Sequence, residues 1–227
     1  PDQNLVRRLA EELGLHAGKL QVSAGQRYFP LYPGGRPVEG LVVEMLILGK
    51  DFLINGYIVG CAETRKGIIV DPGFEAEKIL KAVEAADLDI LQVVLTHGHG
   101  DHTGALSEIC QATNSPAMVS KDDIGLLGNL SSKIEGAIGE GETISVGNQE
   151  FEVKATPGHT PGGVSLVHEE MAIVGDALFA GSLGGTRNLG DYQRQRAAVK
   201  DKILALDDAV ILYPGHGPAT TVAEEKV

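Results

Sequence analysis

Three histidines and one aspartate fall within a few consecutive residues, and this cluster constrains the chain more than any other feature. The segment 96–102 reads THGHGDH, and it follows an apolar run at 90–95 that predicts a buried strand. Ligand-bearing loops follow the carboxyl ends of strands in proteins built from sheets and helices. Only 7 of the 227 residues are histidines. Three of them in one short loop therefore indicate a metal site.

The order of residues within this loop suits more than one ion. Imidazole together with carboxylate favours zinc, iron or manganese. His97 and His99 lie two positions apart, so they point the same way in an extended segment. The glycines between the polar residues are expected to let the backbone approach an ion closely. Asp101 and His102 continue the turn in another direction. One loop could therefore supply ligands to two adjacent ions.

Three later segments repeat the pattern of strand, tight turn and ligand-type residue. His159 lies in TPGHTPGG, Asp176 in IVGDALF and His216 in LYPGHGP, each after an apolar run and beside Gly or Pro. Taken singly, each residue could be an ordinary turn residue, and Asp176 could be a helix cap. Four strand ends that all carry such residues predict that these side chains converge on one site.

These motifs resemble the metallo-β-lactamase superfamily, whose signature is His-x-His-x-Asp-His followed by a later His, an Asp and a final His. The segments PGHTPG, GDALF and PGHGP further resemble the glyoxalase II-like hydrolases. The similarity covers residues 41–227. It implies an α/β fold, a four-layer αββα sandwich of two mixed β-sheets flanked by helices. It also implies two metal ions. The first would be held by His97, His99 and His159, and the second by Asp101, His102 and His216. Asp176 would bridge the two.

The resemblance implies a hydrolase that carries two divalent ions, zinc in the first instance, with iron or manganese as alternatives. Such ions lower the pKa of a bound water to about 7, and Asp101 would act as a catalytic residue that orients the nucleophile or accepts its proton. The implied substrate is a small molecule, a thioester of the hydroxyacylglutathione type. Arg187 and Tyr57 are candidates for substrate contact, although a surface arginine and a core tyrosine are equally expected at these positions.

Two departures weaken a specific glutathione assignment. Related hydrolases carry Gly-Arg-Thr-Asp after the bridging aspartate, whereas residues 184–188 here read GGTRN. The helical domain with which glyoxalase II grips glutathione is also not expected, because the chain ends eleven residues after His216.

Other functions of the same fold remain open. An iron-dependent sulfur (persulfide) dioxygenase would hold one iron on His97, His159 and Asp176. A nuclease is disfavoured by the net charge of −12 and the 4% aromatic content, which leave little to bind phosphates or stack bases. An electron-transfer protein of the flavodiiron type would carry a Glu at the position of His99. A structural metal module is disfavoured because nothing here closes a coordination shell as in structural zinc sites.

The composition also sets the domain organisation and the expected compartment. Residues 1–16 predict a helix and 17–40 a Gly- and Pro-rich loop, so we expect an N-terminal extension at 1–40 before the main domain at 41–227. The extension could pack on the domain or meet a second subunit in a homo-oligomer. We expect no nucleic-acid partner, because the net charge is −12. We also expect no membrane partner, since no apolar run is long enough to span a bilayer.

Cys61 and Cys110 are interpreted as two small buried apolar residues and not as a disulfide. With no visible signal peptide, this predicts a cytoplasmic protein, although a chain that starts at Pro1 allows for removal of an earlier segment. Residues 128–142 have little periodicity and are expected to form a surface loop that borders the site.

Overall fold

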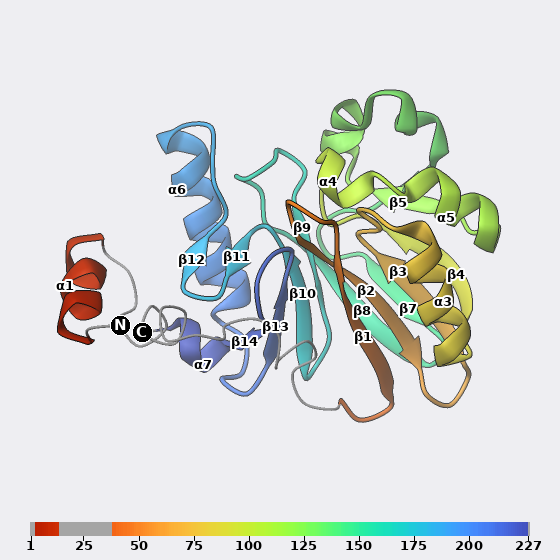
Figure 1. The fold of residues 1–227 in the computed structure, drawn as a ribbon, viewed down its shortest axis with the longest axis horizontal. Coiled ribbons are helices and arrows are strands. Elements are labelled where there is room, and N and C mark those ends of the chain that lie inside the picture. Colours follow the sequence, from red (N-terminus) through yellow and green to blue (C-terminus); the bar gives the residue numbers. More distant parts are fainter. Residues whose placement is uncertain (1–2, 14–37, 227) are drawn as a thin grey trace.

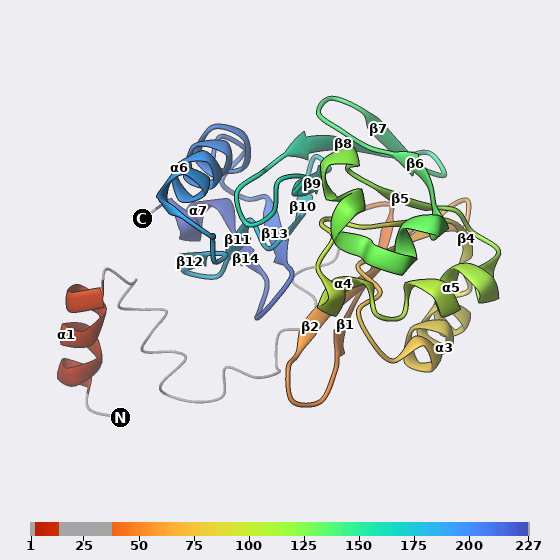
Figure 2. The same ribbon diagram turned by 90° about the horizontal axis from the view of Figure 1, so that it is seen from above.

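Two mixed β-sheets pack face to face, with helices on both outer faces, as the resemblance implies. The computed structural model describes residues 3–13 and 38–226. Figure 1 shows the two sheets at the centre, α3 and α5 on one side and α6 on the other. Figure 2 shows the same layers from above. The predicted αββα sandwich is therefore confirmed.

The first sheet has the order β1-β2-β3-β4-β5-β6, in which β1 to β3 are antiparallel and β3 to β6 are parallel. Its strands and the helical segments between them are β1 (Leu41–Leu48), β2 (Ile54–Cys61), β3 (Lys66–Val70), α3 (Ala76–Ala86), β4 (Asp89–Val94), α4 (Gly100–Thr103), α5 (Leu106–Thr113), β5 (Ala117–Val119), the 3₁₀ segment η1 (Lys121–Lys133) and β6 (Ile134–Ala137).

The second sheet has the order β14-β13-β10-β9-β8-β7, and only β10 and β13 pair in parallel. Its elements and the small two-stranded sheet beside it are β7 (Thr143–Val146), β8 (Gln149–Ala155), β9 (Val164–Val167), β10 (Met171–Gly175), β11 (Leu178–Phe179), β12 (Ser182–Leu183), α6 (Leu189–Ala198), the π-helical turn η2 (Val199–Ile203), β13 (Ile211–Pro214), β14 (Thr220–Thr221) and α7 (Val222–Glu225).

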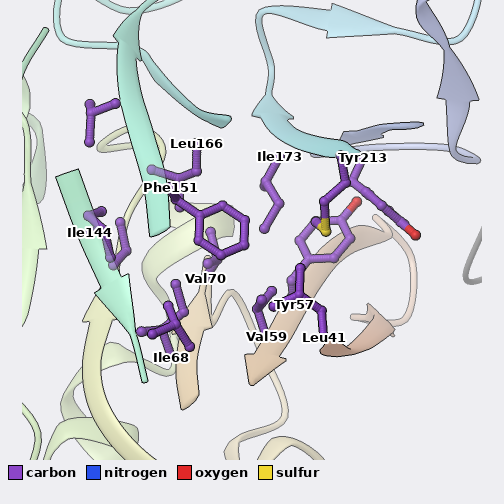
Figure 3. Close-up of a cluster of buried hydrophobic side chains, with 14 of the residues drawn as sticks. Leu41, Tyr57, Val59, Ile68, Val70, Ile144, Phe151, Leu166, Ile173 and Tyr213 are labelled. Carbon is purple, nitrogen blue, oxygen red and sulfur yellow. The ribbon is translucent and has the colours of Figure 1, made fainter. Parts of the chain in front are cut away.

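Three apolar layers hold the sandwich together. The central layer lies between the sheets, and Figure 3 shows Phe151, Ile173 and Tyr213 of the second sheet facing Val70 and Tyr57 of the first. A second layer joins the first sheet to α3 and α5, and a third joins the second sheet to η2 and α7. Because both sheets are covered on both faces, strands such as β2 and β10 are buried along their whole length.

Strand direction places the candidate residues at one edge. Strand β8 is antiparallel to β9, and β9 is antiparallel to β10, so β8, β10 and β13 all run the same way. Their carboxyl ends therefore lie at one edge of the second sheet, as those of β3 and β4 do in the first. Hydrogen bonds of 2.9 Å from Val164 N to Thr96 O and 2.8 Å from Asn55 N to Gly215 O join the two sheets at this edge.

Several predicted segments differ from the structure. Residues 128–142 do not form a plain surface loop: η1 continues to Lys133, and β6 pairs with β5 at the edge of the first sheet. This four-residue strand contains Gly136 and Ala137, which are too small to produce a visible hydrophobic alternation. The helix predicted at 1–16 is described as α1 (Gln3–Leu13), and the end of that prediction and most of 17–40 lie outside the described residues. Val38 is buried in the central layer.

Within residues 3–13 and 38–226, no helix is both long and apolar enough to cross a membrane. Both cysteines are free thiols; Cys61 is buried as predicted, whereas Cys110, on α5, is only partly buried.

Candidate metal centre

The structure brings together all seven side chains that the sequence nominates as ligands. Six of them form two groups of three, each with its ligand atoms within 4.8 Å of one another. We call His97, His99 and His159 the first cluster, and Asp101, His102 and His216 the second cluster. Each cluster combines residues from loops at the ends of both sheets.

Asp176 lies between the two clusters. In the first cluster, His159 Nε2 lies 2.9 Å from His99 Nδ1 and 3.2 Å from Asp176 Oδ2. In the second cluster, Asp176 Oδ1 lies 3.4 Å from His102 Nε2, and Oδ2 lies 3.4 Å from His216 Nε2. Asp176 therefore lies within 3.4 Å of ligand atoms in both clusters, as expected of a bridging ligand.

The spacing of the ligand atoms fits a metal ion. His102 Nε2 lies 3.3 Å from His216 Nε2, and each lies 3.6 Å from Asp101 Oδ2. Ligands bound to zinc at about 2.0–2.1 Å in tetrahedral geometry are separated by about 3.3–3.4 Å. The second cluster therefore already has the spacing of a coordination shell.

In four of the five histidines, one ring nitrogen has a partner outside the centre, which leaves the other nitrogen to bind a metal. Nδ1 of His159 lies 2.6 Å from the Gly185 carbonyl, and Nδ1 of His216 lies 2.7 Å from the Leu53 carbonyl. A carbonyl can only accept, so both Nδ1 atoms carry a proton and both Nε2 atoms face the centre. His97 Nε2 is buried and has no hydrogen-bond partner among the described residues. A cation would satisfy these nitrogens, which is the usual arrangement around a metal.

A buried aspartate supports the loop that carries the first histidines. Asp71 accepts hydrogen bonds from Thr96 N at 2.8 Å and Thr96 Oγ1 at 2.6 Å, and its Oδ2 lies 3.1 Å from His102 Nδ1. Because Thr96 Oγ1 donates to Asp71, it can accept from His97 Nδ1, which lies 3.1 Å away. Asp71 therefore orients both His97 and His102. The sequence left open whether Asp71 was a turn residue or a support, and its left-handed backbone (φ 52°) shows that it is both.

Burial and neighbouring charges shift the pKa values of the histidines in opposite directions in the two clusters. Burial lowers the pKa of His97 well below its ordinary value and also lowers the pKa of His99. Burial opposes protonation of His102 as well, but its hydrogen bond to Asp71 raises the pKa. For His216, burial is outweighed by hydrogen bonds to two carboxylates, which raise the pKa to about 10. Without metal, the lowered pKa values favour the neutral forms of His97 and His99, whereas His216 is protonated at pH 7.

The structure corrects two expectations about single residues. Tyr57 is not a substrate contact: its side chain is 1% exposed in the central layer, and its hydroxyl donates to the Pro214 carbonyl. It faces inward because β2 alternates against the second sheet. The glycine of His97-Gly98-His99 does not serve approach to an ion. A Cβ there would lie 2.8 Å from the Asp123 carbonyl oxygen, so Gly98 makes room for a neighbouring segment.

Two buried residues support the site without any ligand-like motif. Asn55 donates from Nδ2 to the Pro214 carbonyl at 2.9 Å and to the Gly217 carbonyl at 2.7 Å, so it brackets His216. Gln195 donates from Nε2 to the Ala177 carbonyl at 3.0 Å behind the bridging aspartate. A polar residue in an otherwise apolar strand was the available signal for Asn55. Gln195 lies in a polar helix and gives no such signal.

Two phenylalanine rings lie beside His216 of the second cluster. Phe52 lies in the turn between β1 and β2, and its ring centroid is 5.0 Å from that of His216. Phe179 approaches the same imidazole at 5.6 Å. Phe52 is 61% exposed. Two aromatic rings therefore pack against the imidazole of His216.

Comparison with known proteins agrees with this architecture. The family model described as "Metallo-beta-lactamase superfamily" matches residues 49–216. The hydroxyacylglutathione hydrolase GloC of Haemophilus influenzae is 33% identical over 183 residues, which cover 72% of this chain and 86% of that protein. The mitochondrial persulfide dioxygenase ETHE1 of Mus musculus is 32% identical over 188 residues, 75% of this chain and 68% of that protein.

Solved structures show the same fold. The BLEG-1 B3 metallo-β-lactamase superposes with a TM-score of 0.73 at 29% identity, over 81% of this chain and 96% of that one. A protein crystallised in a di-iron-bound form gives a TM-score of 0.69 at 30% identity, over 80% of this chain and 96% of that one. Relatives at similar distance thus include different activities.

Proposed function

The chain belongs to the metallo-β-lactamase superfamily, and from that premise we propose that it is a dinuclear metallo-hydrolase that cleaves a thioester. The observation that carries this proposal is the second cluster. Its three ligand atoms lie 3.3–3.6 Å apart and share Asp176 with the first cluster. Two adjacent ions suit hydrolysis, because together they supply hydroxide at neutral pH and polarise the carbonyl that it attacks.

We assign the metal ligands as the sequence predicts them. His97, His99 and His159 would hold the first ion, Asp101, His102 and His216 the second, and Asp176 both. Imidazole-rich sites of this kind suit zinc, and iron or manganese would also fit the donor set. The sulfur of a thioester leaves as a thiolate, which is stable enough to leave without protonation. The proposed reaction therefore needs no further side chain as a general acid.

Asp101 is the residue to which we assign proton handling. Its buried position would raise the pKa of the carboxyl, but the hydrogen bond from His216 and the charge of His102 keep it well below its ordinary value. It is therefore ionised at neutral pH. Its side chain is partly exposed toward the site, so a carboxylate oxygen can accept a proton from an attacking water.

Arg187 remains a proposed substrate contact. It is 67% exposed, and its guanidinium lies 3.3 Å from Asp191 Oδ2. It follows Gly185, whose carbonyl accepts a hydrogen bond from the candidate ligand His159. The loop that carries Arg187 thus adjoins the first cluster, and an acidic or carbonyl group of a substrate could reach it.

The second candidate is an iron-dependent persulfide dioxygenase, which the similarity to ETHE1 favours. It would use His97, His159 and Asp176 and would leave the second cluster without a role. The well-formed spacing of that cluster supports the hydrolase instead.

One experiment separates the two candidates. Metal content by mass spectrometry is measured on the same preparation as hydrolysis of a lactoylglutathione-type thioester and oxygen uptake on glutathione persulfide. We expect two metal ions and thioester cleavage, both reduced in His159→Ala and in His216→Ala. One iron with oxygen uptake, unaffected by His216→Ala, would refute the hydrolase.

A further inference from the structure

A buried aspartate outside both clusters joins the two loops that carry the first cluster. Asp123 lies in the first turn of η1 and is fully buried. Its Oδ2 accepts a hydrogen bond from Gly98 N at 2.9 Å, and its Oδ1 accepts one from Gly162 N at 2.6 Å. One carboxylate therefore connects a loop of the first sheet with a loop of the second.

The two backbone groups that it binds are close in sequence to the candidate ligands. Gly98 lies between His97 and His99, and Gly162 follows His159 by three residues. All three residues of the first cluster are thus carried by loops that Asp123 holds. The second cluster has other supports, since Asp71 holds His102 and the Leu53 carbonyl holds His216.

The packing around Asp123 requires glycine at both contact points. A Cβ at Gly98 would lie 2.8 Å from the Asp123 carbonyl oxygen, and a Cβ at Gly162 would lie 2.8 Å from Asp123 N and Oδ1. Neither glycine has a positive φ, so the requirement is for space and not for an unusual backbone conformation. Both loops therefore lie so close to Asp123 that a side chain at Gly98 or Gly162 would clash with it.

We propose that Asp123 is a positioning residue, which sets the separation of His97 and His99 from His159 and so controls metal binding at the first cluster alone. This inference rests on the proposed metal centre. Among the described residues, Asp123 belongs to none of the candidate ligand groups, and each of its oxygens accepts a hydrogen bond from a backbone N–H group. A carboxylate suits the task, since it accepts two hydrogen bonds at once and both are charge-assisted.

The test uses Asp123→Asn, which keeps the size of the side chain but replaces one accepting oxygen with an amide that faces an N–H group. Asp122→Asn is the matched control, because it makes the same change one residue earlier at an exposed position. Cobalt affinity is measured by chelator competition, together with the visible spectrum of the bound cobalt. Both are recorded in two backgrounds: His216→Ala, which retains the first cluster, and His159→Ala, which retains the second.

We expect Asp123→Asn to weaken cobalt binding 10- to 100-fold in the His216→Ala background, the range typical of a lost support. Its cobalt spectrum should also change. In the His159→Ala background, affinity should stay within twofold, and Asp122→Asn should change neither. Equal losses in both backgrounds would mean general destabilisation and would overturn the proposal, as would no loss in either. If the unmutated chain binds no metal, it is the metal centre itself that fails.

A second variant keeps the test decisive if Asp123→Asn does not fold. Gly162→Ala retains the carboxylate but places a methyl group against it, which pushes away the loop that carries His159. It should weaken the first cluster in the same selective way, and wild-type affinity in this variant would overturn the proposal.

Discussion

Asp71→Asn tests how the structure selects the metal-binding nitrogen of His102. The Asp71 carboxylate accepts from Thr96 N and Thr96 Oγ1, and it pairs with His102 Nδ1 at 3.1 Å. Asparagine has one accepting oxygen, and the backbone N–H of Thr96 takes it. The amide NH₂ then faces His102 Nδ1 and makes that atom an acceptor, so the proton moves to Nε2, the nitrogen that faces the second cluster.

The size of the effect follows from this change of tautomer. Loss of such a support weakens metal binding about 10- to 100-fold, which corresponds to about 1.4–2.7 kcal/mol. The weakening should affect the second cluster more than the first, because His97 is reached only through Thr96. Asparagine tolerates the left-handed backbone of residue 71, so the substitution adds little strain of its own.

The assay is a zinc titration against a competing chelator, with the metal content checked after dialysis. Asp87→Asn is the matched control, since Asp87 also has a left-handed backbone (φ 51°) but is exposed at the end of α3. We expect Asp71→Asn to retain one tightly bound ion and to lose the other, and Asp87→Asn to retain both. Two ions bound by Asp71→Asn with wild-type affinity would refute the tautomer argument.

Two further predictions concern the chain without metal. The pKa of His216 is raised to about 10, so His216 is protonated at pH 7 and must lose a proton to bind a metal, and the pKa of His102 is raised as well. Zinc affinity at the second cluster should therefore increase with pH toward 10. Calorimetry in two buffers of different ionisation enthalpy should show proton release, and identical heats would contradict it. Removal of metal should also lower stability, since an ion at about 100 times its Kd contributes about 2.7 kcal/mol. A thermal melt with and without chelator should show a midpoint lower by about 5–11 °C, whereas equal midpoints would mean that no ion is bound to the native state.

The residues that face the centre were predictable from the sequence because their chemistry is restricted. Only a few side chains bind a divalent ion, and the three that lie outside the first loop, His159, Asp176 and His216, each follow an apolar run and lie beside glycine or proline. The αββα layers could be predicted with them, because the resemblance carries the topology. The short strand β6 could not, since a four-residue edge strand with Gly136 leaves no periodic pattern.

The supports of these residues are a different case. The Leu53 and Gly185 carbonyls orient His216 and His159, and a backbone carbonyl is present at every position, so no residue type marks it. Asp123 does have a distinctive side chain, but its partners are backbone N–H groups 25 and 39 residues away. Its neighbour Asp122 looks the same in the sequence and is exposed. The candidate ligands can therefore be predicted from residue types in the sequence. Their orientation cannot, because it depends on backbone groups that only the folded chain brings into contact.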